Sequence, residues 1–196
     1  MYLGKFNLKS VNNTKSIACN LYELSKPGDM FALYGDIGSG KTTFVKYFIN
    51  KAIKNIKVPS PSYNIYFKYE CLKAPIYHMD AWRIENSNEI FNLGVLDYFK
   101  ESIFLIEWAE KIENYLPERK LNIKIEYNKN FRTITFHGNK NWEKRLKRNF
   151  YIEIWLEKKL NKNLLDFLNK AKILNKNIYA LQNDASKRVY YRGLDE

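Results

Sequence analysis

The sequence is poor in cysteine and has no long apolar run. Only Cys19 and Cys71 occur among its 196 residues, and nothing near them has the spacing of metal ligands, so two reduced thiols are expected. No window approaches eighteen uncharged apolar residues, and the N-terminus MYLGKFNLKS has neither an apolar signal segment nor a cleavage site. These absences predict a cytoplasmic protein that makes no membrane contact.

Acidic residues are also scarce relative to basic ones. Asp and Glu number 21 against 33 Lys and Arg, which gives a formal net charge of +12. More than half of the excess positive charge lies beyond residue 138. Such an excess can attract RNA, but no RRM, KH or comparable motif is present. A bias toward Lys, Asn and Ile along the whole chain accounts for the charge without a partner, and we favour that interpretation.

What the sequence does contain is a loop suited to phosphate. In LYGDIGSGKTTF, residues 33 to 44, the pattern G-x-x-x-x-G-K-T lies between an apolar run typical of a buried strand and a segment with helical i, i+4 periodicity. Its glycines allow successive N–H groups to face phosphate, Lys41 would reach the β- and γ-phosphates, and the Thr42 hydroxyl would ligate Mg²⁺. A P-loop requires this strand, loop and helix context.

Two carboxylates end later apolar runs and compete for a role beside this loop. Asp80 closes IYHMD and Glu107 closes FLIEW. Ligands of open α/β sheets collect at the carboxyl ends of strands, so both could lie near the phosphates. One would ligate Mg²⁺ and the other would orient or activate the attacking water, but spacing alone does not assign them. His78 shares a strand face with Asp80 and could touch phosphate or a partner, or serve as a hydrogen-bonded structural residue.

Alternation of strand and helix patterns predicts an α/β P-loop NTPase fold with a mostly parallel sheet flanked by helices. A first strand is expected at residues 3 to 8, followed by a helix capped by Asn12 or Asn13, and helical periodicity recurs in NSNEIFNLGVLDYF. LNIKIEY and FRTITFH predict an antiparallel hairpin. Beyond Gly138 a basic, mostly helical C-terminal extension is expected, so the predicted domains are residues 1–138 and 139–196.

Several motifs in order resemble one family. GDIGSGKTTF, SPSY, YHMDAWRI, LGVLDYF and IEWAEKIENYLP, spread over about residues 5 to 138, are similar to TsaE, also called YjeE. That family is the ATPase subunit of the bacterial machinery that makes threonylcarbamoyladenosine in tRNA. The resemblance implies a Mg²⁺-dependent ATPase, weak alone, that binds ATP and acts with TsaB and TsaD type subunits. Contact with tRNA would be indirect, through that complex.

The resemblance also implies roles for individual residues. Glu107 matches the acidic metal ligand, beside Thr42, and Asp80 matches the acid needed for hydrolysis, so the expected catalytic residues are Lys41, Asp80 and Glu107. Ser60 to Tyr63 match a switch-like loop. Nucleotide-binding positions by this resemblance and by the P-loop are Thr14, Asp36, Gly38, Ser39, Gly40, Lys41, Thr42, Thr43 and Arg132. Hydrolysis would reset a TsaB–TsaD transferase complex rather than modify tRNA directly.

Two alternatives remain at this stage. A P-loop small-molecule or nucleoside kinase usually carries an Arg-bearing lid and an acceptor pocket, whereas the corresponding region here is a predicted hairpin with only Arg132. A nucleotide-holding RNA-binding module is the third hypothesis, motivated by the net charge alone.

The C-terminal segment carries a second resemblance. LQNDASKRVYYRG, residues 181 to 193, is similar to the small N-lobe of aminoglycoside/choline-kinase-like phosphotransferases, and the apolar helix expected before it fits the start of that lobe. The chain ends before any nucleotide-binding lysine or catalytic Asp loop of such a lobe. We therefore expect a truncated lobe without kinase activity of its own.

Overall fold

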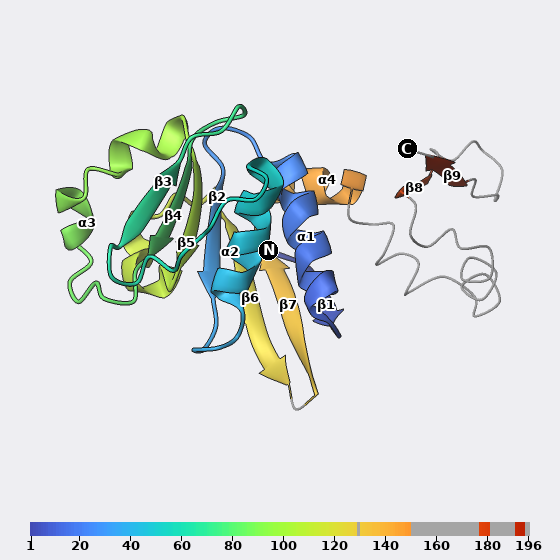
Figure 1. The fold of residues 1–196 in the computed structure, drawn as a ribbon, viewed down its shortest axis with the longest axis horizontal. Coiled ribbons are helices and arrows are strands. Elements are labelled where there is room, and N and C mark those ends of the chain that lie inside the picture. The colour runs from blue at the N-terminus through green and yellow to red at the C-terminus, as the bar shows by residue number, and fades with distance from the viewer. Residues whose placement is uncertain (129, 150–176, 181–190, 195–196) are drawn as a thin grey trace. The chain divides into compact units, whose positions relative to one another are not determined.

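The computed structural model describes residues 1–128, 130–149, 177–180 and 191–194 (Figure 1). The chain divides into two compact units, Met1–Arg145 and Leu146–Glu196. Within the second unit, β8 (Asn177–Ala180) pairs antiparallel with β9 (Tyr191–Leu194). The helix expected before them and most of the phosphotransferase-like segment lie outside the described residues. The predicted domain boundary near 138 stays a prediction.

A seven-stranded sheet forms the centre of the first unit, in the order β1-β7-β6-β2-β5-β4-β3 (Figure 1). Neighbouring strands β6, β2, β5 and β4 run parallel, whereas β1, β7 and β3 are antiparallel to their neighbours. The predicted mostly parallel sheet and the β6–β7 hairpin are confirmed. The strands are β1 (Tyr2–Leu8), β2 (Met30–Tyr34), β3 (Tyr66–Tyr69), β4 (Ile76–Asp80), β5 (Ile103–Glu107), β6 (Leu121–Asn128) and β7 (Phe131–His137).

Helices cover both faces of this sheet, as expected for an α/β fold. On one face lie α1 (Val11–Leu24) and α2 (Lys41–Ala52), where Phe31 of β2 packs edge-on against Phe48 with ring centroids 5.0 Å apart. The alternate side chains of β2, Met30 and Ala32, point to the other face. There they pack in one core cluster with residues from α3 (Glu89–Asn92) and from the 3₁₀ helix η2 (Ala109–Tyr115).

The expected cap of α1 was wrong, and the helical segment predicted after residue 86 is divided into two short helices. The cap of α1 is Ser10: its hydroxyl accepts the Asn13 N–H at 3.4 Å, and the Asn13 side chain accepts the Ser10 N–H at 3.0 Å. Asn13 is thus the third-residue partner of a capping box. The periodic segment after residue 86 forms α3 and the separate 3₁₀ helix η1 (Leu96–Lys100), because Gly94 between them has φ of +62°.

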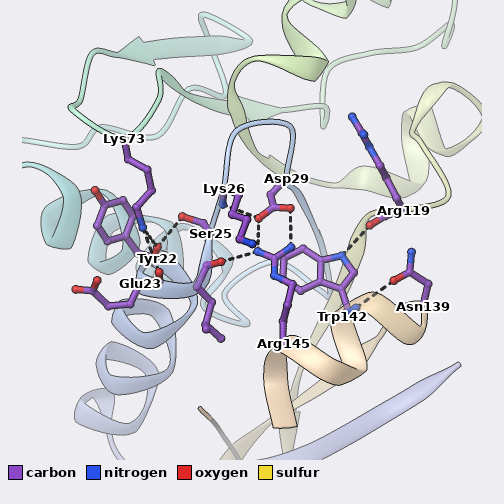
Figure 2. A network of polar contacts seen from close by, with 11 residues as sticks. Tyr22, Glu23, Ser25, Lys26, Asp29, Lys73, Arg119, Asn139, Trp142 and Arg145 are labelled. Carbon is purple, nitrogen blue, oxygen red and sulfur yellow. Dashed lines mark hydrogen bonds and ion pairs between the residues drawn. The ribbon is translucent and has the colours of Figure 1, made fainter. Parts of the chain in front are cut away.

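Helix α4 (Lys140–Asn149) begins on the first unit, as Figure 2 shows. The Asn139 side chain caps it, accepting the N–H groups of Asn141 and Trp142. Trp142 is 1% exposed, packs against Phe31, and donates its indole N–H to the Arg119 carbonyl at 2.7 Å. Trp142, in the first turn of α4, therefore completes the core beside β2.

Arg145, one turn further along, fixes the same helix to the turn before β2 (Figure 2). Its guanidinium donates to both carboxylate oxygens of Asp29, with one distance of 2.8 Å, and to the Leu24 carbonyl at 2.5 Å. It also lies over the Trp142 ring at 3.9 Å. A bidentate pair that is only 13% exposed on each side is geometrically specific, unlike a solvated surface pair.

A chain ending at Gly138 is therefore expected to be less stable than one ending at Asn149. Loss of a buried tryptophan costs about 3 kcal/mol or more of the free energy of unfolding. For a chain of this size, that corresponds to roughly 6–12 °C in the melting temperature. Thermal unfolding of the two chains followed by circular dichroism measures the difference; equal melting temperatures would show that α4 adds nothing to the first unit.

Among the residues that the structure describes, no helix is long and apolar enough to cross a bilayer.

Candidate nucleotide and metal site

The phosphate-binding loop lies between the end of β2 and the start of α2. Gly35 has φ of +133°, and a Cβ built on it would lie 2.1 Å from the Ile125 carbonyl oxygen of β6. Gly40, the residue before α2, has φ of +112°. The first glycine is needed because the loop runs against the β6 backbone, and the second because the left-handed conformation strains any other residue.

Lys41 is held in place by the loop itself. It is 5% exposed, and its ammonium donates to the carbonyl oxygens of Gly35 at 2.5 Å and Asp36 at 2.9 Å. The Trp108 ring lies beneath it, with its centroid 3.8 Å from Nζ. Burial lowers the pKa of Lys41, and the nearby Glu107 carboxylate opposes that shift. Two neutral carbonyl groups and an aromatic ring therefore position the Lys41 ammonium.

Glu107 lies next to Thr42, at the end of β5. The Thr42 hydroxyl donates to Glu107 Oε2 at 2.8 Å, and Glu107 Oε1 lies 2.8 Å from His78 Nε2. Glu107 is 2% exposed and His78 is fully buried. Two neighbours thus fix the carboxylate, one from the P-loop helix and one from the adjacent strand. His78 is therefore observed as a buried residue hydrogen-bonded to Glu107, the second of the two roles considered for it.

Asp80 lies directly opposite Glu107 in the parallel pairing of β4 and β5. The N–H of Trp82 donates to its Oδ1 at 2.9 Å, and the Ser62 hydroxyl donates to its Oδ2. Ser62 belongs to the segment expected to act as a switch-like loop, so Asp80 connects that loop to the sheet. Asp80 and Glu107 therefore lie side by side at the carboxyl ends of two neighbouring strands, as the sequence predicted.

Two cavities border the P-loop. One, of about 430 Å³, is lined by Lys41, Thr42, Ser62, Asp80 and Glu107 among others. The second, of about 370 Å³, is lined by Thr14, Ser39, Thr43 and Arg132 among others, and Gly38 and Gly40 border both. Arg132 also donates to the Gly38 carbonyl at 3.2 Å. Lys41 and both carboxylates line the first cavity, whereas Lys9 and Arg132 are the charged residues that line the second.

Nearly all residues predicted for the site therefore line one of these two cavities. Asp36 contributes only through its carbonyl, which receives Lys41 and the Ser39 N–H. Sequence reasoning missed Trp108 under Lys41 and Ser62 on Asp80. Both stand in the quoted motifs IEW and SPSY, but their partners are distant in the chain, and spacing does not reveal them.

The donor set fits Mg²⁺ bound together with a nucleotide. Thr42 and Glu107 offer hard oxygen ligands on one cavity, as Mg²⁺ prefers. No group of three or more His, Cys, Asp or Glu side chains that could hold a metal occurs in the part of the chain that the structure describes. The protein would therefore supply only one or two ligands, and phosphate oxygens and water the rest, as is usual for Mg²⁺ in nucleotide sites.

A phosphate-cradling loop, a buried lysine and two strand-end carboxylates on a mostly parallel sheet define a P-loop NTPase. The family model "Threonylcarbamoyl adenosine biosynthesis protein TsaE" matches residues 8–134. The chain belongs to the TsaE family. The match ends before α4, so it does not bear on the phosphotransferase-like segment, which stays a prediction.

Individual relatives agree with this assignment. The tRNA threonylcarbamoyladenosine biosynthesis protein TsaE of Bacillus subtilis is 39% identical over 123 residues, covering 62% of this chain and 77% of the relative. The protein of the same name from Haemophilus influenzae is 37% identical over 106 residues, covering 54% and 67%. The crystal structure of Bacillus YdiB superposes with a TM-score of 0.62 at 34% identity, covering 75% of this chain and 93% of YdiB.

Proposed function

We propose that the chain binds ATP with Mg²⁺ and hydrolyses it as an accessory subunit in threonylcarbamoyl modification of the adenosine beside the anticodon in tRNA. One observation carries the proposal: Thr42 and Glu107 are hydrogen-bonded on the same cavity that Lys41 and Asp80 line. Family membership adds the pathway, because the relatives are named for this tRNA modification.

Phosphate binding would be the work of the loop and Lys41. The Lys41 ammonium would leave the carbonyl oxygens of Gly35 and Asp36 and donate to phosphate oxygens instead. Phosphate oxygens are stronger acceptors because they carry negative charge. Trp108 keeps the ammonium near the mouth of the loop through its ring. Thr14 and Arg132, on the second cavity, would contact the rest of the nucleotide.

Glu107 and Thr42 would hold the metal ion, and His78 would keep the Glu107 carboxylate turned toward Thr42. When bound, Mg²⁺ would neutralise part of the phosphate charge and polarise the terminal phosphate. Asp80 would orient the attacking water from the neighbouring strand. Its position is set by Trp82 and Ser62, so movement of the Ser60–Tyr63 loop would change it.

The partners in this proposal are TsaB and TsaD type subunits. Apolar side chains are exposed at the rim of the first cavity: Ile37 is 78% exposed, Tyr63 81% and Trp82 45%. Such side chains at a cavity mouth suit coverage by another protein, which would exclude water and position the loop. Hydrolysis would then reset the complex, since ATP and ADP states would bind the partners with different affinity.

Replacing Glu107 with glutamine is the direct test of the metal assignment. Glutamine keeps the size and a hydrogen-bond acceptor but loses the charge, so ATP affinity measured with Mg²⁺ is expected to fall about tenfold or more. Affinity measured in EDTA should not change. Trp108 fluorescence reports binding, since its ring contacts Lys41.

The matched control is Glu118→Gln, an exposed glutamate outside both cavities. It should leave both affinities unchanged. Equal loss with Mg²⁺ and with EDTA in Glu107→Gln would mean that Glu107 supports the loop and does not hold metal.

A further inference from the structure

A groove between α1 and α2 concentrates positive charge away from the catalytic carboxylates. It has a volume of about 510 Å³, and no acidic residue lines it. Four lysines do: Lys15 on α1, Lys46 and Lys51 on α2, and Lys54 just beyond α2. All four are exposed. The two helices lie side by side on the same face of the sheet (Figure 1).

Most of this charge has no counter-charge. Lys51 pairs with Glu23 at 2.9 Å, but within the described part of the chain no carboxylate lies within ion-pair distance of Lys15, Lys46 or Lys54. Like charges gathered on one surface repel and destabilise the fold slightly. The other lining side chains include Tyr47 and Asn50 but no aliphatic one. An anion in the groove would relieve the repulsion.

The lining favours a nucleic acid over an acidic protein. A protein interface has an apolar core, and carboxylate recognition favours the planar fork of arginine; the groove has neither. Lys, Asn and Tyr are among the side chains that contact phosphate and sugar in nucleic-acid complexes. The bias toward Lys, Asn and Ile along the chain accounts for the net charge. It does not explain why four lysines line one groove that has no acidic residue.

We propose that the α1–α2 groove binds the phosphodiester backbone of RNA. Thr43 lines the groove and both nucleotide cavities, so the RNA would lie beside the P-loop. The inference goes beyond the proposed function, in which tRNA is met only through partner subunits. It predicts binding by phosphate contacts, which is salt-dependent and independent of base sequence.

The test is binding of a fluorescently labelled tRNA transcript to the full chain between 50 and 200 mM salt. The variant carries Lys15→Gln, Lys46→Gln and Lys54→Gln. Affinity at low salt should fall about tenfold or more, and the slope of log affinity against log salt should become shallower by about 2 to 3. ATP binding should be unchanged, which separates this inference from the proposed function.

A control variant makes the same charge change elsewhere: Lys26→Gln, Lys100→Gln and Lys140→Gln, at exposed lysines outside the groove. Its tRNA affinity should stay within about twofold of the unmodified chain. Equal losses in both variants, or none in the groove variant, would overturn the proposal. So would an acidic peptide that competes with tRNA at equal concentration, because the groove would then be a protein site.

Discussion

Replacing Lys41 with alanine is expected to abolish nucleotide binding, with at least about a hundredfold loss of affinity for ATP and for ADP. Lys41 is almost fully buried, and its ammonium donates to a carbonyl of the loop that would bind phosphate. A hydrogen bond to a charged group contributes about 1.5–3 kcal/mol, and about 1.4 kcal/mol is tenfold in affinity. Loss of one such bond lowers affinity about tenfold to a hundredfold, and loss of two bonds to phosphate oxygens lowers it about a hundredfold or more.

Lys41→Met separates charge from packing in this experiment. Methionine keeps an unbranched apolar stem against Trp108 but has no ammonium, so it should bind nucleotide as poorly as Lys41→Ala. Lys57→Ala, at an exposed lysine outside the cavities, is the control and should bind normally. Isothermal titration with ATP measures all four proteins; an affinity of Lys41→Ala within threefold of the unmodified chain would remove Lys41 from the site.

Asp80→Asn should leave nucleotide binding intact and lower partner-stimulated hydrolysis by about a hundred- to a thousandfold. Asparagine can still accept the Trp82 N–H and contact Ser62, so the loop should stay in place. It is a far weaker base, and positioned acid–base groups typically contribute 10²–10⁴-fold to rate. Binding and turnover measured on one preparation distinguish this outcome from misfolding.

Ser62→Ala is the companion variant for Asp80. It removes one hydrogen bond to the carboxylate without touching its charge, so a smaller loss of turnover is expected. If Asp80→Asn turned over ATP at the normal rate, Asp80 would be a structural residue and the assignment of the two acids would need to be reversed or abandoned.

Local sequence patterns were sufficient to predict the P-loop and the positions of the two strand-end carboxylates. The P-loop needs a strand before it and a helix after it, and the apolar run at β2 and the periodicity of α2 supply both. Parallel strands end at one edge, so Asp80 and Glu107 could be placed together from their position after apolar runs. These predictions succeeded because they depend on residues close in sequence and on one rule of sheet topology.

Contacts across the fold could not be read in this way. The run after Gly138 predicted only a basic, mostly helical extension, yet Arg145 pairs with Asp29, 116 residues earlier, and Trp142 is buried beside Phe31. Trp142 and Arg145 lie within a single turn of helix. No periodic apolar pattern in the sequence therefore indicates that this turn packs against the core. Likewise, the Thr42–Glu107 hydrogen bond spans 65 residues and depends on strand order, which composition does not encode.

The measurement that tests the account most directly is the rate of ATP hydrolysis by the full chain, alone and with purified TsaB and TsaD type subunits, in the presence of Mg²⁺. The account predicts slow turnover alone and a large increase with the pair, absent when Asp80→Asn replaces the unmodified chain. Turnover that is the same with and without the partners would contradict it.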